Sequence, residues 1–494
     1  MSFNIYPVTQ SDERYDGYRI FINGREYPCD CARVSKIPFN RRWPGYQRKP
    51  SQSELINFIS LETDEPLEFK IITKDPFEEV LSLPQNSITN IKKEDEYTIS
   101  FTLPGSGYYS VEPFGRRNPL LIFADKPEKN DYKNQKNLIY FPAGIHNAGT
   151  IELDDDQTLY IDKGAVVYAN VHAKNKKNIT IAGRGILDNA KNKEVIHFEV
   201  AASKEHKDVG NASRTHTVHI EFCDNVKIEG ITIRHSLVYN IKPVGCKDLD
   251  IRDVKILGCW RYNSDGIDMH NCENVEITNC FIRTFDDCIC VKGFDPWMNR
   301  DELNFNGKDY DFFKNVRVSD CVLWNDWGKC LEIGAETRSK VIENIVFENC
   351  KIIHVTHTPL DIMNVDYAHV KDVVFQNISV YFDKVIPQPL YQESEEMPYE
   401  QKDLNYSPTL INAHVVFHHE YSAGEQRRGK IDNVVFKNID VTGDQDIKLK
   451  FAGYDTEHQC KDITVSNISR NGKKLGENDV IITKGEYTSN ISFD

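Results

Sequence analysis

The chain has 494 residues and carries 60 Lys and Arg against 75 Asp and Glu, so its formal net charge is −15. This balance argues against a nucleic-acid partner, because proteins that neutralise a phosphate backbone concentrate positive charge. Hydrophobic residues make up 40% of the chain, which is ordinary for a globular protein. No stretch approaches the roughly 20 apolar residues of a membrane span. We therefore expect neither a nucleic-acid nor a membrane partner.

The N-terminus and the cysteines bear on the compartment. The sequence begins MSFNIYPVTQSDER, without the basic and apolar segments of a secretory signal. The 13 cysteines are odd in number, and several lie in apolar runs: Cys272, Cys280, Cys321 and Cys350. A cysteine in such a run behaves as a small hydrophobe, so we expect buried free thiols and a reducing compartment. A cytoplasmic location is favoured; a processed secreted form would begin in the same way. No cysteine pairs have the spacing of a structural zinc site, so no metal is expected.

Residues 1–133 consist of short apolar segments separated by turn residues. Alternating apolar residues predict strands at 17–24, 68–73, 97–102 and 120–124. Several short strands divided by Gly and Pro are typical of a small β-sandwich. The charged segment 125–136 suits a linker to the rest of the chain.

The region 134–494 repeats one unit, in which Asn or Asp begins two short apolar-alternating strands divided by a polar bend. Copies begin at Asn225, Asp248, Asn274, Asn315, Asn344, Asp372, Asn433 and Asp462. One unit cannot bury its own inner face, so neighbouring copies have to stack into a continuous coil. The short period without helical spacing predicts an all-β fold, a right-handed parallel β-helix. A leucine-rich horseshoe has a similar period, but Leu is not the repeating residue here.

Two insertions mark one face of this coil. They lie near 293–312 and 383–430, and both follow the most acidic stretch of the repeats, 263–293. Insertions on one face of a solenoid form the walls of a groove, which is where such folds bind their ligands. We therefore place the functional site beside 263–293.

Four aspartates in that stretch are expected to meet. Asp265 and Asp286 are 21 residues apart, close to one short coil, so they should lie on neighbouring rungs about 4.8 Å apart. Asp268 and Asp287 add two more carboxylates. Carboxylates this close cannot all ionise cheaply, so one proton should remain near neutral pH. A protonated acid beside an ionised base is what hydrolysis of a glycosidic bond requires. Capping of the bends and a calcium site are the alternatives.

The same residues resemble the polygalacturonase-type glycoside hydrolases of family 28 and their clan relatives, the dextranases and isopullulanases of family 49. Family 28 carries Asn-Thr-Asp-Gly followed about one rung later by Asp-Asp-Cys. This sequence has Asn-Ser-Asp-Gly at 263–266 and Asp-Asp-Cys at 286–288. The resemblance covers about 137–470, and the sandwich ahead of the coil is more similar to the dextranase side of the clan.

The resemblance implies an inverting hydrolase of an oligosaccharide or polysaccharide that works without a cofactor. It implies that Asp286 is the general acid, and that Asp265 and Asp287 hold and deprotonate the attacking water. In an inverting enzyme the acid and base are about 6.5–9.5 Å apart, which leaves room for that water.

Two departures from the family pattern concern the substrate. Lys329 stands where the family has the His of Gly-His-Gly, and a Lys is a more compact cation with a different reach. Asp361 and Met363 replace the cations of the Arg-Ile-Lys strand that binds a galacturonate carboxylate. A uronate would meet an acid there instead of a bidentate cation. We therefore favour a neutral glycan, with polygalacturonase activity as the alternative.

Further residues are expected to contact the sugar. They are Asp268, Lys292, Lys329, Glu332, Asp361, Asp366, Trp297 and Trp327. Glu332 alternates with two apolar residues, so it should face the groove. Asp361 and Asp366 are equally suited to capping their bend, and Trp297 to packing within the insertion. Trp324 follows an apolar run and is assigned to packing.

Two other classes of function stay open. A β-helix lyase or fructotransferase could use Lys329 or Lys292, although the paired aspartates would then have no role. A non-catalytic carbohydrate-binding solenoid would need no carboxylates on adjoining rungs. The sequence indicates neither the sugar, nor the mode of attack along a polymer, nor the oligomeric state.

Overall fold

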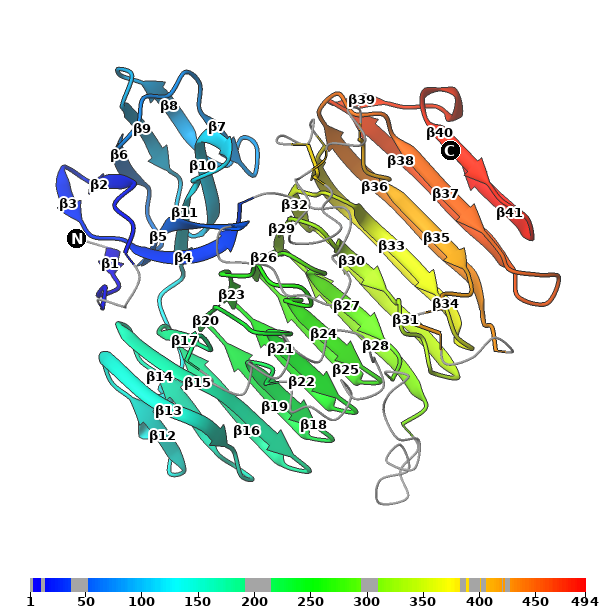
Figure 1. Cartoon of the computed structure of the whole chain (residues 1–494), viewed down its shortest axis with the longest axis horizontal. Coiled ribbons are helices and arrows are strands. Elements are labelled where there is room, and N and C mark those ends of the chain that lie inside the picture. Colours follow the sequence, from blue (N-terminus) through cyan, green and yellow to red (C-terminus); the bar gives the residue numbers. More distant parts are fainter. Residues whose placement is uncertain are drawn as a thin grey trace.

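The computed structural model describes residues 3–9, 14–36, 52–191, 215–294, 310–382, 388–390, 400, 406–419, 421–422 and 427–494. Two smaller sheets of six and five strands precede one sheet of 30 strands (Figure 1). Within this described part, the named helical elements are two 3-10 turns, η2 (Tyr132–Asn134) and η5 (Glu477–Asp479). The predicted all-β fold is therefore confirmed.

The two smaller sheets form the predicted sandwich. The first contains β1 (Phe3–Ile5), β4 (Asp30–Ser35), β5 (Ser53–Thr63), β7 (Leu81–Leu83), β10 (Gly107–Arg116) and β11 (Leu120–Asp125). The second contains β2 (Tyr18–Ile22), β3 (Arg25–Tyr27), β6 (Leu67–Thr73), β8 (Thr89–Lys93) and β9 (Thr98–Leu103). Their facing side chains, among them Ile20, Phe69 and Ile122, share one hydrophobic core. The division of the chain at residues 133 and 134 into two units stays our proposal.

The 30-stranded sheet winds into a parallel β-helix with three faces. It begins with β12 (Leu138–Phe141) and β13 (Gly144–Glu152). The first face contains β14 (Thr158–Ile161), β16 (Lys177–Gly183), β19 (Asp224–Glu229), β22 (Lys247–Arg252), β25 (Glu273–Thr278), β28 (Phe312–Ser319), β31 (Val341–Glu348), β34 (His369–Tyr381), β36 (Lys430–Thr442), β38 (Cys460–Arg470) and β41 (Thr488–Phe493).

The other two faces follow from β15 (Ala165–Lys174), which pairs into both of them. The second contains β17 (Ile186–Asp188), β20 (Thr232–Arg234), β23 (Lys255–Ile256), β26 (Phe281–Thr284), β29 (Val322–Asn325) and β32 (Lys351–His354). The third contains β18 (Val218–Glu221), β21 (Ile241–Val244), β24 (Ile267–His270), β27 (Ile289–Lys292), β30 (Lys329–Ile333), β33 (Thr358–Asn364), β35 (Ile411–Val415), β37 (Lys448–Ala452) and β40 (Ile481–Lys484). The short antiparallel β39 (Lys473–Lys474) pairs with β38.

The repeated Asn and Asp residues mark the bends. In the copies named above, these residues have φ between 53° and 60°, the left-handed region that Asn and Asp adopt more readily than other side chains. Their side chains also bond from rung to rung. Asn344 Nδ2 donates to Asn315 Oδ1 at 2.7 Å, and Asn315 Nδ2 donates to Asn274 Oδ1 at 2.9 Å. The repeat therefore both turns the backbone and links neighbouring coils.

Replacing Asn315 separates these two contributions. Asn315→Gly keeps the left-handed turn and loses two ladder hydrogen bonds, which should cost about 1–2 kcal/mol of unfolding free energy. Asn315→Ala loses the same bonds and adds the strain of a left-handed Ala, so it should be the less stable of the two. Thermal or urea unfolding of both variants checks this order. Equal stability of Ala and Gly at 315 would contradict it.

The sandwich packs on the second face of the β-helix. One core contains Phe58 and Phe123 from the sandwich with Phe281 and Trp324 from the coil. Asp125, at the start of the predicted linker, is buried and accepts hydrogen bonds from Tyr6 at 3.1 Å and Lys255 Nζ at 3.0 Å. The linker prediction was wrong at this end, because composition alone does not show that a charged residue has a buried partner.

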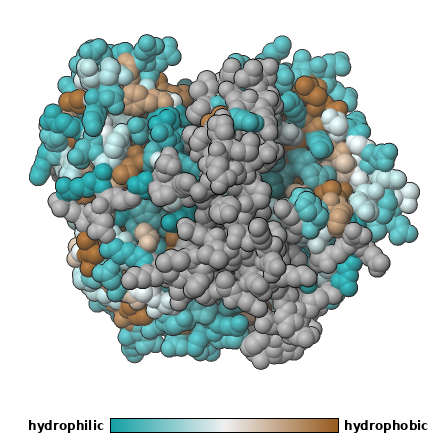
Figure 2. All heavy atoms as spheres, in the orientation of Figure 1, coloured by the Kyte–Doolittle hydropathy of each residue, from teal (hydrophilic) through white to brown (hydrophobic). Residues whose placement is uncertain are grey.

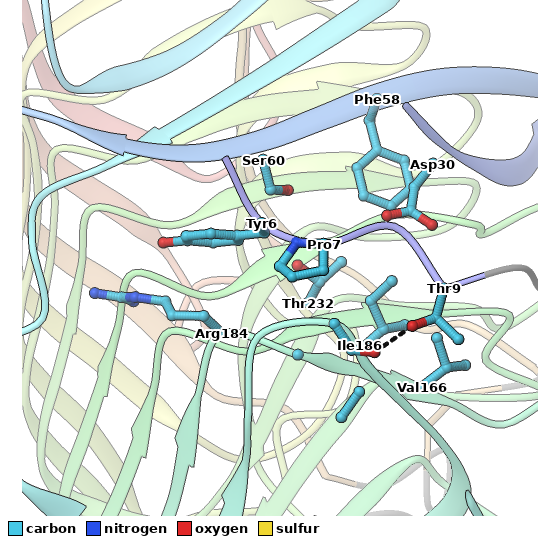
Figure 3. A pocket seen from close by; sticks show the side chains of 13 residues that line it. Tyr6, Pro7, Thr9, Asp30, Phe58, Ser60, Val166, Arg184, Ile186 and Thr232 are labelled. Carbon is cyan, nitrogen blue, oxygen red and sulfur yellow. Dashed lines mark hydrogen bonds between the residues drawn. The ribbon is translucent and has the colours of Figure 1, made fainter. Parts of the chain in front are cut away.

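A small cavity lies in the same junction (Figure 3). Its volume is about 10 Å³, enough for roughly one water molecule. The side chains of Tyr6 and Arg184 extend in the same direction, away from Asp30, and the hydroxyl of Thr9 bonds the Gly164 carbonyl. None of the predicted site residues lines this cavity, so it belongs to the packing of the junction.

The described surface in Figure 2 is mostly hydrophilic, with separated hydrophobic patches. No helix in the described part of the chain is long and apolar enough to cross a membrane.

Candidate active site

The third face of the β-helix carries an in-register row of polar side chains. Asp268 on β24 pairs with Cys290 on β27, which pairs with Glu332 on β30. Glu332 pairs with Asp361 on β33, and Asp361 with Asn412 on β35. Side chains at in-register positions of a parallel sheet stack about 4.8 Å apart. The row therefore brings three acids from distant segments, Asp268, Glu332 and Asp361, onto one face, next to the turns that hold the Asp-Asp motif.

Asp265, Asp286 and Asp287 converge at those turns, as the sequence predicts. One oxygen from each of the three carboxylates lies within 4.8 Å of the others. The backbone holds the turns together, because the Gly266 N–H donates to the Asp287 carbonyl at 2.8 Å. Ile267 pairs with Ile289, so this rung has 22 residues and Asp265 lies level with Asp287. The predicted level pairing of Asp265 with Asp286 was wrong by one residue.

Gly328 allows the Asp-Asp turn to sit this close to the next rung. A Cβ on Gly328 would lie 2.5 Å from Asp287 Oδ1 and 2.6 Å from the Asp287 backbone nitrogen. The Gly328 N–H also donates to the Phe285 carbonyl at 3.1 Å. Any larger residue has to push the Asp-Asp turn aside.

We expect Gly328→Ala to lower activity strongly, because the reacting carboxylates of a hydrolase tolerate displacements of well under about 1 Å. Gly476→Ala is the matched control, since a Cβ there would meet nothing closer than 3.7 Å. Initial rates and thermal unfolding of both variants measure the effect. A Gly328→Ala variant as active as the control would show that the turn is not held by this contact.

Lys292 is the buried counter-ion of the acids. Its Nζ lies 2.7 Å from Asp268 Oδ2, and 3.5 Å from both an Asp265 and a Glu336 oxygen. It also lies over the Tyr239 ring, 5.2 Å from the centroid. Burial opposes the charge on Lys292, but the surrounding carboxylates raise its pKa well above the usual value, so it remains a cation.

Lys329 contacts Asp287, the second carboxylate of the Asp-Asp motif. Its backbone N–H donates to Asp287 Oδ1 at 2.8 Å. Its Nζ bonds Glu332 and lies 3.3 Å from Asp361 Oδ2. Glu332 in turn hydrogen-bonds the Asp287 carboxylate. The Lys therefore fixes the Asp287 side of the site, and two acids already neutralise its charge.

The environments of Asp286 and Asp287 push their pKa values apart. Burial first, and then the Asp287 charge, raise the pKa of Asp286 to about 7. Burial also disfavours the charged form of Asp287, but Lys329 and Lys292 outweigh it and hold its pKa below the usual value. Burial and the charges of Asp268 and Asp286 raise the pKa of Asp265 well above its usual value. Near neutral pH, Asp287 is thus the ionised group and Asp286 retains a proton for part of the time.

The remaining predicted contact residues divide into groups. Asp268, Glu332 and Asp361 are at most 1% exposed and form the floor beneath the three acids rather than its open surface. Asp366 is fully buried beyond β33, and its N–H donates to Thr337 Oγ1 at 2.9 Å, which fits the capping alternative. The predicted sugar contact of Asp366 is therefore not supported.

The tryptophans also differ from one another. Trp327 is part-exposed and packs against Phe285 at 5.4 Å and Tyr262 at 5.7 Å, and Phe285 is next in sequence to Asp286. Trp324 is fully buried and its Nε1 donates to Asp326 at 2.9 Å, which agrees with the packing assignment. Trp297 lies outside the described residues, as does most of each predicted insertion.

Sequence reasoning missed several neighbours of the acids. Glu336 faces Lys292, and the Asn263 N–H donates to Asp286 Oδ2 at 3.2 Å. Asn412 Nδ2 donates to Asp361 Oδ1 at 2.5 Å, and His414 Nδ1 lies 2.9 Å from Asn412 Oδ1. Asn412 is 51 residues from Asp361 across an insertion, so only the register of the coil relates them. Asn263 was already part of the quoted motif and is the one that could have been identified.

The chain is thus a parallel β-helix protein with three aspartates clustered at adjoining turns, an arrangement that can provide an acid and a base. The family model of glycosyl hydrolases family 28 matches residues 131–484. The chain belongs to that family of glycoside hydrolases, in which inversion of the anomeric centre is typical. The predicted resemblance is therefore confirmed.

Relatives and structures agree with this assignment. An exopolygalacturonase from Zea mays is 29% identical over 191 residues, covering 32% of this chain and 45% of the relative. A polygalacturonase from Gossypium barbadense is 22% identical over 320 residues, covering 63% and 65%. The matches thus span less than two thirds of either relative. The structure of Dex49A from Penicillium minioluteum is similar over 98% of this chain and 96% of that chain, with a TM-score of 0.58 and 14% identity. This last likeness shows that the fold, sandwich region included, is shared.

Proposed function

We propose that the chain hydrolyses a glycosidic bond of an oligosaccharide or polysaccharide, with Asp286 as general acid and Asp287 as general base. The observation that carries this proposal is the pair of adjacent carboxyl groups whose pKa values are pushed apart. Such a split is how one site provides an acid and a base at the same pH. Asp286 protonates the leaving glycosidic oxygen, and Asp287 takes a proton from the attacking water.

Asp265 has a supporting role in this proposal. Its raised pKa favours the protonated form, so it orients the water by hydrogen bonding while Asp287 removes the proton. The family resemblance implies that Asp265 and Asp287 share the role of base, and the lowered pKa of Asp287 supports Asp287 in this proposal.

The pH dependence follows from the same groups. A general acid has to be protonated, so activity should fall as the pH rises through about 7, where Asp286 loses its proton. A general base has to be ionised, and the lowered pKa of Asp287 places the acidic limb below the usual range of an aspartate. The profile of kcat against pH checks both limbs. A rate that rises from pH 6 to pH 9 would contradict the assignment of Asp286.

We further propose that the sugar bound beside Lys329 is neutral. The charges of the buried Asp361 and Glu332 lie beneath that position, and Lys329 is already paired with both of them. These acids would repel a uronate carboxylate, whereas neutral hydroxyl groups avoid the repulsion. Polygalacturonide hydrolysis is the second candidate, because the curated relatives quoted above carry the names polygalacturonase and exopolygalacturonase.

Paired substrates that differ only at C6 decide between the two candidates. We expect release of reducing ends from galacto-oligosaccharides or another neutral set such as isomalto- or malto-oligosaccharides, and little from galacturono-oligosaccharides. Asp361→Asn removes one negative charge and frees Lys329 in part, so it should raise the rate on galacturonides relative to wild type. A wild-type enzyme that cleaves only galacturonides would overturn the neutral-sugar proposal while leaving the hydrolase proposal intact.

The other functional classes have distinct signatures. A lyase would form an unsaturated uronate, which absorbs in the ultraviolet. A non-catalytic solenoid would bind glycans equally well in wild type and Asp286→Asn, without turnover in either.

A cytoplasmic location also remains a proposal. It is supported by the cysteines, all of which are free thiols and nearly all of which are buried. Recovery of the protein only from the secreted fraction of its source would contradict it.

A further inference from the structure

A second cluster of ionisable side chains lies at the N-terminal end of the third face. His172 on β15 and His219 on β18 are in register on neighbouring rungs. Glu221 follows two residues after His219 and so projects from the same face of the strand. One ligand atom from each of these three residues lies within 4.8 Å of the others. Two imidazoles and a carboxylate are a ligand set that zinc accepts.

Glu152 orients the first of these ligands. It is in register with His172 on β13, and its Oε2 lies 2.7 Å from His172 Nδ1. This leaves His172 Nε2 directed at Glu221, 3.2 Å from Oε2. In a tetrahedral zinc site with ligands at about 2.0–2.1 Å, neighbouring ligand atoms are about 3.3 Å apart. A carboxylate on the far nitrogen of a ligating histidine is also the usual support for such a ligand.

We propose that His172, His219 and Glu221 bind one Zn²⁺, with Glu152 as the residue that orients His172. All three ligands are part-exposed, which leaves a coordination position for water or a sugar hydroxyl. Lys174, 3.6 Å from the other oxygen of Glu221, stays paired to that oxygen. The site lies on the same face as the acids. His219 is in register with Lys242 on β21, and β21 pairs with β24, so the ion would be two rungs, about 9–10 Å, from Asp268.

Metal content and calorimetry test this site without reference to activity. Full-length protein is stripped with a chelator, equilibrated with Zn²⁺ and dialysed, and its metal is then counted by mass spectrometry. We expect one Zn²⁺ per chain and a rise in the thermal midpoint. Co²⁺ in place of Zn²⁺ should give the visible absorption of a tetrahedral nitrogen and oxygen site.

Variants separate this site from other sites on the chain. His219→Ala should abolish stoichiometric binding, and Glu152→Gln should weaken it about 10- to 100-fold, as expected for loss of an orienting carboxylate. His458→Ala, a part-exposed histidine near the C-terminus, should bind Zn²⁺ as wild type does. Asp287→Asn should also bind normally, because the three aspartates are a separate cluster. Unchanged binding in His219→Ala, or none in a folded wild-type chain, would overturn the proposal.

Discussion

Asp286→Asn is expected to lower kcat about 10²–10⁴-fold, the usual contribution of a general acid. Asn keeps the shape of the side chain and can still accept the Asn263 N–H bond, which measures 3.2 Å in the native site. It has no proton to give to the leaving oxygen, so the loss falls on the chemical step. KM should change little, because Asp286 lies at the reacting bond rather than along the remaining sugars.

The dependence on the leaving group distinguishes loss of the acid from general damage. A substrate with a good leaving group, such as a nitrophenyl glycoside, needs little protonation, so Asp286→Asn should retain much more of the wild-type rate on it. Asp444→Asn, which changes an exposed carboxylate, is the matched control and should behave as wild type. If Asp286→Asn lost the same fraction of the wild-type rate on substrates with good and with poor leaving groups, Asp286 would not be the general acid.

Lys292→Met is expected to destabilise the protein by about 3–5 kcal/mol, the usual cost of leaving buried charges without their partner. Lys292 is 4% exposed and its Nζ lies within 3.5 Å of carboxylates from Asp265, Asp268 and Glu336. Met matches the length of the side chain, so the change isolates the charge. The loss should shrink as the pH falls, because protonated carboxyl groups need no cation.

A second change should partly restore the stability. Adding Asp268→Asn to Lys292→Met removes the closest unpaired charge, so the double variant should be more stable than the single one. Lys314→Met breaks a part-exposed pair with Glu273, 3.3 Å apart, and should cost only about 0–1 kcal/mol. Urea unfolding at two pH values measures all three variants. A Lys292→Met loss as small as that of Lys314→Met would show that the acids are not held by this cation.

The fold could be predicted because its signal is local and repeated. Each left-handed bend needs a residue that tolerates positive φ, and Asn and Asp recur there at a nearly constant period, as at Asn274 and Asn315. Between those bends apolar and polar residues alternate, and this alternation defines the buried side of each strand. The convergence of Asp265 with Asp286 and Asp287 follows from the same period, without any knowledge of side-chain contacts.

The features that the sequence did not predict depend on the register between rungs and on contacts between segments far apart in the chain. Asp265 lies level with Asp287 because the rung has 22 residues rather than 21, and a one-residue difference cannot be read from a period that varies between coils. Asn412 reaches Asp361 only across an insertion. Asp125 was expected to lie in a linker, and Asp366 was expected to contact the sugar. Both are buried, and their burial depends on residues far away in sequence.

The spacing between the acid and the base bears on the stereochemical outcome. We expect about 6.5–9.5 Å between the carboxyl groups of an inverting pair, against about 5–5.5 Å in a retaining pair. One oxygen from each of Asp265, Asp286 and Asp287 lies within 4.8 Å of the others, which is a shorter measure than the separation of whole carboxyl groups. The expected separation therefore stays a prediction, which the stereochemistry of the product tests.

The anomeric configuration of the first product tests the account most directly. Proton NMR during the first minutes of cleavage, before the product mutarotates, shows whether the new reducing end is inverted. Asp287 acting on a water, with Asp286 as the acid, gives inversion in a single displacement. A product that retains the configuration of the substrate would mean that one of the three aspartates is a nucleophile, and would contradict the proposed acid and base.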